Sequence, residues 1–353
     1  MSDWKKRSQI LQDVVFFEYV DSSLAREAPH VFVWDLDKTY LDTHFESISG
    51  LYRTIKEKAF QKRNVPGTRT LVKALTVRGD SFFPIYFVTA SPPQMEKRIR
   101  EKLELDGIKP FGIFCKDNLK NLKPGRFRRL NQQVGYKLQA LMHLRARLGQ
   151  DLKQVLWGDD SESDAVIYSL YSDICARRLV DRPLAHILSF FNVRGEQVDT
   201  ILELLKQVPE ADPVERAYIN LASDTDPDYY SKFGRRTLAT YNAFQAALDL
   251  YQEKHLSLEQ VEFVALDLKQ NYGFTLEELA KSLDDLVYRR VLVLEEALKI
   301  KDFFVNKKLL PNNFSYSRQA ISQEEASRLR VEKGSRLIDA WVPNFIDYLH
   351  DFR

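Results

Sequence analysis

The stretch Val31-Phe-Val-Trp-Asp35-Leu-Asp37-Lys-Thr-Tyr-Leu-Asp-Thr43 decides the fold of this chain. Its four leading apolar residues run without interruption into Asp35, as in a strand buried on both faces of a parallel sheet. Side chains two positions apart on an extended backbone point to the same side, so Asp35 and Asp37 would project together beyond the strand. Open α/β sheets bind ligands in the crevice at that end. The stretch therefore predicts an α/β sheet with an acidic site at its carboxyl edge.

Two carboxylates this close together repel each other unless a cation lies between them or one of them holds a proton. Either arrangement is useful for chemistry. The same letters also fit a plain acidic turn in which Thr39 or Asp42 caps a helix. The rest of the chain has to decide between a site and a turn.

Two further apolar runs end in polar residues in the same way. Residues 84–89 predict a strand that ends at Thr89, and the prolines that follow suit the start of a helix. Residues 155–164 predict another strand and a helix after it, with Asp159, Asp160 and Asp164 at the junction. Helix capping needs only one such residue. The additional acidic side chains therefore favour a second half of the acidic site.

Lys137 is a candidate partner of an anion. A helix is predicted from Gly135 to near Gly149, which places this lysine at the helix start. A cation there opposes the helix macrodipole, whose N-terminus already carries partial positive charge. An exposed lysine tolerates that position, but a bound anion nearby explains it better.

The remaining segments suggest three regions. Helical spacing of apolar residues predicts helices over 4–28, 45–60, 179–208 and 235–253, and a strand over 216–221. Beyond 255 only helices are expected, with capping boxes beginning at Ser257 and Thr275. The predicted domains are an N-terminal helix and linker (1–28), an α/β core with a helical insertion near 179–208 (29–254), and a helical C-terminal region (255–353).

Composition limits the class of protein. With 353 residues, 44% of them hydrophobic and 29% charged, the chain is typical of a globular protein of about two domains. The sequence has no apolar run long enough for a spanning helix and no secretory leader, which predicts a cytoplasmic location. Two cysteines and six scattered histidines argue against a disulfide framework and a zinc site.

The formal net charge of +2 hides a basic segment. Residues 97–153 contain 15 Lys or Arg and 5 Asp or Glu, so this segment carries +10 and the remainder 2 − 10 = −8. Its most basic part is the connection 116–129. Such a stretch either forms a solvated face or attracts an anionic lipid surface or another polyanion. We expect the latter because the connection leaves a strand on the side of Asp35 and Lys137.

Taken in order, Asp-x-Asp-x-Thr, Thr89, Lys137 and Gly-Asp-Asp-x-x-x-Asp resemble the four motifs of the haloacid dehalogenase-like (HAD) phosphatase superfamily. Within it, residues 31–174 are similar to the catalytic domain of the actin-patch phosphatidate phosphatases. The similar pieces are Val65-Pro66-Gly67, Thr89-Ala90-Ser91-Pro92, Tyr136-Lys137-Leu138 and Gly158-Asp159. The sequence departs from that family at Lys38, Ala90 and Asp160-Ser161. The resemblance implies a Rossmann-like HAD fold, with a mainly parallel sheet flanked by helices.

The resemblance also implies residue roles. Asp35 would be the nucleophile that forms an aspartyl-phosphate, and Asp37 the acid and base that serves the leaving oxygen and then the water. Thr89 and the N–H groups after it would hold the phosphoryl oxygens, and Lys137 would balance their charge. Asp35, the backbone carbonyl of Asp37 and Asp159 would hold Mg²⁺, with Asp160 or Asp164 in support.

The short connections between the motifs leave little room for a cap domain, which favours a bulky substrate such as a phospholipid. The expected function is therefore Mg²⁺-dependent hydrolysis of a phosphate monoester. The alternative is a partner-binding protein on a HAD-like core with little activity. The intact acidic cluster argues against this alternative, because buried carboxylates are costly to keep without chemistry.

Overall fold

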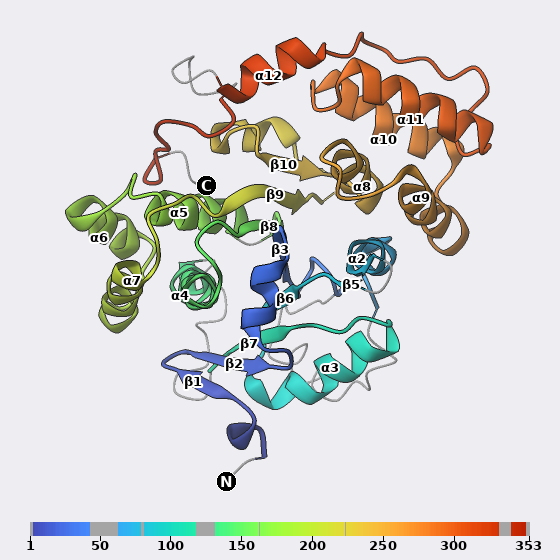
Figure 1. The fold of residues 1–353 in the computed structure, drawn as a ribbon. Helices are drawn as coiled ribbons and strands as arrows, with labels where there is room; N and C mark the ends of the chain where they lie inside the picture. Colours follow the sequence, from blue (N-terminus) through green and yellow to red (C-terminus); the bar gives the residue numbers. More distant parts are fainter. Residues whose placement is uncertain are drawn as a thin grey trace. The chain divides into compact units, whose positions relative to one another are not determined.

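The computed structural model describes residues 3–42, 63–78, 81–117, 131–161, 163–222, 224–331 and 340–350 (Figure 1). The chain divides into two compact units. Unit 1 consists of Met1–Arg63, Phe82–Ile219 and Ile346–Arg353, and unit 2 of Asn64–Ser81 and Asn220–Phe345. This division by contacts differs from the predicted domain ranges, which stay a prediction.

Unit 1 is built on a sheet whose strands follow the order β1-β2-β7-β6-β3-β8-β9. The strands β7, β6, β3 and β8 are parallel, whereas β1 and β2 are antiparallel at one edge. Their bounds are β1 Gln9–Leu11, β2 Val14–Glu18, β3 His30–Asp35, β6 Ile85–Thr89, β7 Gly112–Lys116, β8 Lys153–Asp159 and β9 Val214–Asn220. The predicted α/β fold with a mainly parallel sheet is confirmed.

The strand of the opening motif, β3, lies in the middle of the sheet between β6 and β8. Every residue from Val31 to Asp35 is buried, which explains its unbroken apolar run. Trp34 stacks on Trp157 of β8 with ring centroids 4.5 Å apart, and Trp157 stacks in turn on Tyr218 of β9 at 4.8 Å. This row of rings fills one face of the sheet and fixes the three strand ends relative to one another.

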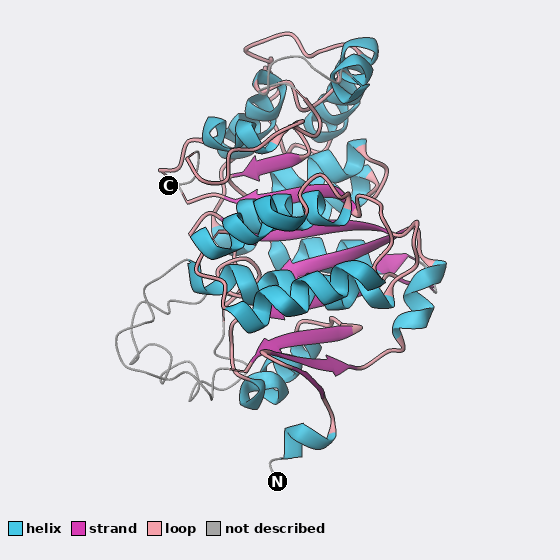
Figure 2. Ribbon diagram, turned by 90° about the vertical axis from the view of Figure 1, so that its left-hand side faces the viewer, coloured by secondary structure: helices cyan, strands magenta, loops and turns pink. Residues whose placement is uncertain are grey.

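Helices cover both faces of this sheet. Figure 1 shows α4 and α7 on one side of the strands and α3 on the other, and Figure 2 shows the strands lying edge to edge between the helices. The bounds are α3 Glu96–Leu105, α4 Asn131–Arg147, α5 Asp164–Cys175, α6 Asp181–Phe190 and α7 Gly195–Gln207. Ile99 and Leu103 of α3 are buried, as is Met95 directly before the helix. The helical stretch predicted over 179–208 is two helices, α6 and α7.

The helix predicted within 4–28 is wrong. This region contains a 3-10 helix η1 (Asp3–Lys6), the hairpin of β1 and β2, and a second 3-10 helix η2 (Ser22–Glu27). The run Val14-Val15-Phe16-Phe17 is buried as a strand that pairs antiparallel with β7. Neighbouring β-branched and aromatic residues favour a strand, and pairing with β7 outweighs the helical spacing.

Unit 2 is mainly helical. Its helices are α2 Thr68–Thr76, α8 Ala243–Gln252, α9 Leu258–Tyr272, α10 Leu276–Tyr288, α11 Leu294–Asn306 and α12 Gln323–Val331, with the 3-10 helix η6 Pro227–Phe233 and the strand β10 Thr237–Thr240. The capping boxes at Ser257 and Thr275 are present, and Gly273 ends α9 in the left-handed conformation at φ 75°. The predicted helical C-terminal region is confirmed.

Helix α2 belongs to this helical unit although it precedes the second phosphatase-like motif in the chain. The Thr70 hydroxyl donates to Asp267 of α9 at 2.7 Å, and the Gln260 amide donates to the Ala74 carbonyl at 2.7 Å. Gly67 has φ 76°, and a Cβ added at this position would lie 2.9 Å from the Ala243 side chain. Close packing of α2 on α8 and α9 therefore depends on a residue without a side chain.

Three other predictions have mixed outcomes. The long helix over 235–253 is wrong at its start, because Thr237–Thr240 is a strand and α8 begins at Ala243. The helix predicted over 45–60 lies outside the described residues, as does the basic connection beyond Asp117. Among the described residues, no helix combines the length and the apolar character that crossing a membrane requires.

Candidate active site

The carboxyl edge of the sheet in unit 1 brings the sequence motifs together. Asp35 ends β3, Thr89 ends β6 and Asp159 ends β8, and these three strands are adjacent and parallel. All three side chains are buried, with exposed fractions of at most 2%. Strand register alone therefore places a carboxylate, a hydroxyl and a second carboxylate side by side.

Lys137 connects the two acidic motifs. Its ammonium lies 2.9 Å from Asp35 Oδ1 and 2.5 Å from Asp164 Oδ1, and all three side chains are buried. Helix α4 begins at Asn131, so Lys137 lies in the second turn and the argument from the helix macrodipole was wrong. Its position is explained instead by the two carboxylates that it contacts.

Asp37 is held by the hydroxyl of Thr89. The Thr89 hydroxyl donates to Asp37 Oδ2 at 2.6 Å and accepts from the Ser91 N–H at 3.0 Å. The Thr39 hydroxyl donates to Asp35 Oδ2 at 3.3 Å, which orients the first carboxylate from the other side. The two motif aspartates thus each accept a hydrogen bond from a different threonine hydroxyl.

The third motif is held by its own turn and by the absence of a side chain at Gly158. The Ser161 N–H donates to Asp159 Oδ1 at 2.6 Å, and the Ser161 hydroxyl contacts the same oxygen. Asp164 Oδ2 accepts from the Asp159 N–H at 3.2 Å. A Cβ at position 158 would lie 2.4 Å from Asp164, so only glycine allows this approach.

These carboxylates form a group that fits a hard cation. Among the described residues, Asp35, Asp159 and Asp164 offer oxygens that all lie within 4.8 Å of one another. The Asp37 side chain contacts Thr89, and Asp160 is half-buried and outside this group. Oxygen-only ligands suit Mg²⁺. Three formal negative charges against the one positive charge of Lys137 leave an excess that a divalent cation balances.

A buried polar triad anchors the loop that follows Asp35 and contains Asp37. The Tyr40 hydroxyl donates to Asp106 Oδ2 at 2.7 Å, and the Lys102 ammonium lies 2.6 Å from both oxygens of that carboxylate. The three side chains are buried, so the charges are screened little by water. This triad could not be predicted from the sequence, because Tyr40 lies 66 positions from the carboxylate that it contacts.

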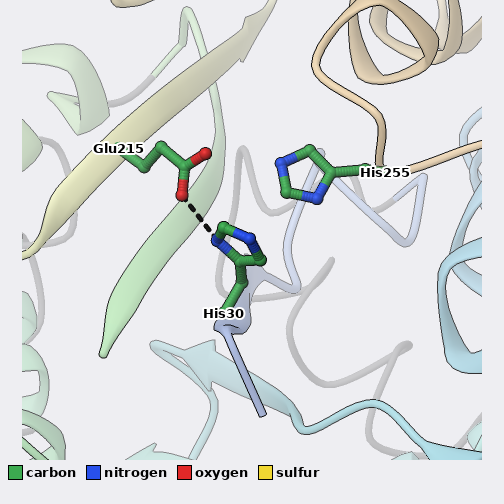
Figure 3. A group of neighbouring side chains, drawn as sticks. All are labelled: His30, Glu215 and His255. Atoms are coloured by element: carbon green, nitrogen blue, oxygen red, sulfur yellow. Dashed lines mark ion pairs between the residues drawn. The ribbon is translucent and has the colours of Figure 1, made fainter. Parts of the chain in front are cut away.

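The opposite end of β3 carries a second charged contact. His30, the first residue of the strand, has its Nδ1 2.6 Å from Glu215 Oε2 of β9 (Figure 3). The pair lies at the amino end of the strand, whereas Asp35 lies at its carboxyl end. We therefore treat it as separate from the phosphatase-like site.

Comparison with known families now identifies this part of the chain. Residues 30–179 match the family model of the phosphatidate phosphatase APP1 catalytic domain. This segment of the chain is therefore similar to an APP1-type catalytic domain. No curated protein and no solved structure matches the chain. The predicted resemblance to HAD-like phosphatidate phosphatases is confirmed, and the match supports a phosphatase.

The APP1-type segment contains every residue that the sequence assigned to the site. It begins at the first residue of β3 and ends four residues after the C-terminal end of α5. The matched segment therefore contains the whole candidate site. Strand β9 and most of unit 2 lie outside the match.

Proposed function

We propose that the protein is a Mg²⁺-dependent phosphatase that hydrolyses a phosphate monoester on a phospholipid through an aspartyl-phosphate intermediate. The observation that carries this proposal is the buried contact of Lys137 with both Asp35 and Asp164 at the sheet edge. The Lys137 ammonium favours the ionised, nucleophilic form of Asp35. Its positive charge also lowers the repulsion between the carboxylates and an incoming phosphate. The APP1 family match supports a phospholipid as the class of substrate.

Asp35, Asp159 and Asp164 are the side chains that would hold Mg²⁺. The donor set fits because it consists of buried carboxylate oxygens that cluster within 4.8 Å. When bound, the cation neutralises the phosphate and the nucleophile. Asp160, being half-buried, would act at most as a support for the ligands.

The residues of the chain divide the reaction into two displacements. In the first, an Asp35 oxygen attacks phosphorus, the bond from phosphorus to the leaving oxygen breaks, and Asp37 gives its proton to that oxygen. In the second, Asp37 takes a proton from water, the water oxygen attacks phosphorus, and the bond to Asp35 breaks. Thr89 holds Asp37 through its hydroxyl at 2.6 Å, so the acid and base group stays in place for both steps.

The substrate surface is the second part of the proposal. The basic connection 116–129 leaves β7 near the sheet edge that carries Asp35, and only its first two residues are described. Its charge would draw the enzyme to an anionic lipid surface facing the cytoplasm. Reversing Lys123, Arg126 and Arg128 to Glu should lower kcat/KM for phosphatidate in vesicles, yet leave p-nitrophenyl phosphate hydrolysis nearly unchanged.

The test of the function is a paired assay on the purified protein. Phosphatidate in detergent micelles and p-nitrophenyl phosphate are each incubated with Mg²⁺ or with EDTA, and orthophosphate release is measured. We expect release that requires Mg²⁺ and a higher kcat/KM for phosphatidate. After acid quenching with a labelled substrate, the label should remain on the wild-type protein and be absent from Asp35→Asn. Turnover without a trapped label at position 35 would overturn the covalent route.

A further inference from the structure

A tyrosine hydroxyl behind the site joins the elements that carry two of its groups. Tyr136 is fully buried and precedes Lys137 on α4. Its hydroxyl donates to the Thr89 carbonyl at 2.7 Å and lies 3.0 Å from the Phe114 carbonyl. The side chain therefore spans from the helix to the end of β6 and the middle of β7.

The peptide between Thr89 and Ala90 is oriented by this contact. The Leu36 N–H donates to the Val88 carbonyl at 2.9 Å, so that carbonyl faces β3. Carbonyls alternate along a strand, and the Thr89 carbonyl accordingly faces β7 and meets Tyr136. Because a trans peptide holds its N–H opposite its C=O, the Ala90 N–H faces the side of β3, where Asp35 and Asp37 lie.

The same contact fixes the helix that carries Lys137. Adjacent residues on a helix are about 100° apart, so holding Tyr136 against β6 and β7 sets both the rotation and the height of α4. Lys137 then reaches Asp35 at 2.9 Å and Asp164 at 2.5 Å. The Tyr136 hydroxyl thus positions both the Ala90 N–H and the Lys137 ammonium.

We propose that Tyr136 is a positioning residue that aligns the Thr89–Ala90 peptide and Lys137 for the phosphoryl group. The inference rests on the proposed function and deepens it. Burial keeps the pKa of the Tyr136 phenol well above its ordinary value. The hydroxyl consequently stays a donor throughout the working pH range.

The test compares two buried tyrosines that lose only a hydroxyl. Tyr136→Phe removes the contact with Thr89 and Phe114, whereas Tyr171→Phe removes a hydrogen bond of 3.1 Å to Gln154, away from the site motifs. Both residues are fully buried, so each variant reports the loss of one interior hydroxyl. We expect kcat for Tyr136→Phe to fall by about 10 to 100-fold and that of Tyr171→Phe by less than about 3-fold.

A binding measurement separates positioning from a merely structural role. Inhibition by inorganic orthophosphate should weaken by about 10-fold in Tyr136→Phe and stay unchanged in Tyr171→Phe, while Mg²⁺ affinity stays unchanged in both. Assays run at a temperature where circular dichroism shows each variant folded. Equal orthophosphate inhibition in the two variants would overturn the role of Tyr136.

A measurement on the wild-type protein does not depend on the variants' stability. Orthophosphate with Mg²⁺ should slow amide hydrogen exchange in a peptide that covers residues 88–95, in which Pro92 and Pro93 carry no N–H. Unchanged exchange there would refute alignment of this peptide. Loss of turnover in Asp35→Asn, measured in parallel, tests the proposed function by itself, so the two failures are distinguishable.

Discussion

The two units differ in the polar groups that the sequence marks most clearly. In unit 1, charged side chains with exposed fractions of at most 2% meet at a sheet edge, namely Asp35, Lys137, Asp159 and Asp164. In unit 2, the polar residues that the sequence marks clearly are the helix caps at Ser257 and Thr275, which lie at helix ends. Burying a charge destabilises the folded state unless the charge is paired. A helix cap stabilises the folded state. The candidate site therefore lies in unit 1, whereas the marked caps of unit 2 stabilise its helices.

The largest effects are expected from one substitution in each unit. Asp35→Asn should lower phosphatase activity by about 10³-fold or more, because the attacking charge is lost, with little change in thermal stability. Leu283→Ala in α10 should lower the free energy of unfolding by about 2 to 5 kcal/mol, because this leucine is fully buried. Its activity per folded molecule should stay near wild type. Near-normal turnover by Asp35→Asn would contradict the assignment.

The next comparison lies within the acidic motif of β8. Asp159→Asn should weaken Mg²⁺ binding by about 10 to 100-fold in calorimetry, because Asp159 belongs to the buried carboxylate group. Asp160→Asn is the matched control, since this neighbour is half-buried. An equal loss of Mg²⁺ affinity in both variants would show that the cation is not held by the buried group.

The packing of unit 2 can be tested with two glycines of nearly equal φ. Gly67 and Gly273 have φ of 76° and 75°, but only Gly67 has a neighbour in the way of an added Cβ. Gly273→Ala should cost about 1 kcal/mol from backbone strain alone. Gly67→Ala should cost about 2 to 3 kcal/mol, because it also separates α2 from α8. Equal values from denaturant titrations would mean that α2 adapts without strain.

The smallest effect concerns pH. Burial, with Arg147 adding to it, lowers the pKa of His143 in α4 from 6.5 to about 4. The unfolded chain therefore binds a proton that the folded chain rejects between these pH values, and stability falls as pH drops from about 6.5 towards about 4. In His143→Gln, the loss of unfolding free energy between these two pH values should be smaller by about 1 to 2 kcal/mol. The effect is this small because the histidine is only half-buried. An unchanged slope would contradict the shift.

Much of the site could be predicted because parallel strands turn sequence order into spatial order. Apolar runs that end at Asp35, Thr89 and Asp159 fixed both the strands and the edge where they meet. The N-terminal strand Val14–Glu18 was missed because its pairing with β7 is formed by residues about 100 positions away. Local spacing cannot show such a partner.

Other misses have the same origin. Tyr136 was visible only as part of a family-like string, and its role depends on the Thr89 and Phe114 carbonyls, which no side-chain pattern reveals. The signal that could have drawn attention to it is a bulky hydroxyl-bearing residue directly before the motif lysine. Likewise, nothing near Thr70 in the sequence indicates that it contacts Asp267.

The chain passes between the two units four times, at 63/64, 81/82, 219/220 and 345/346. A single gene-fusion boundary therefore cannot exchange unit 2 for another module, because α2 would remain behind with the catalytic segment. Recombination would have to replace two separate stretches at once. For the same reason, one proteolytic cut between α2 and α8 would leave two fragments that the packing of α2 on α8 and α9 still holds together. The helical unit therefore cannot be exchanged as one continuous stretch of the chain.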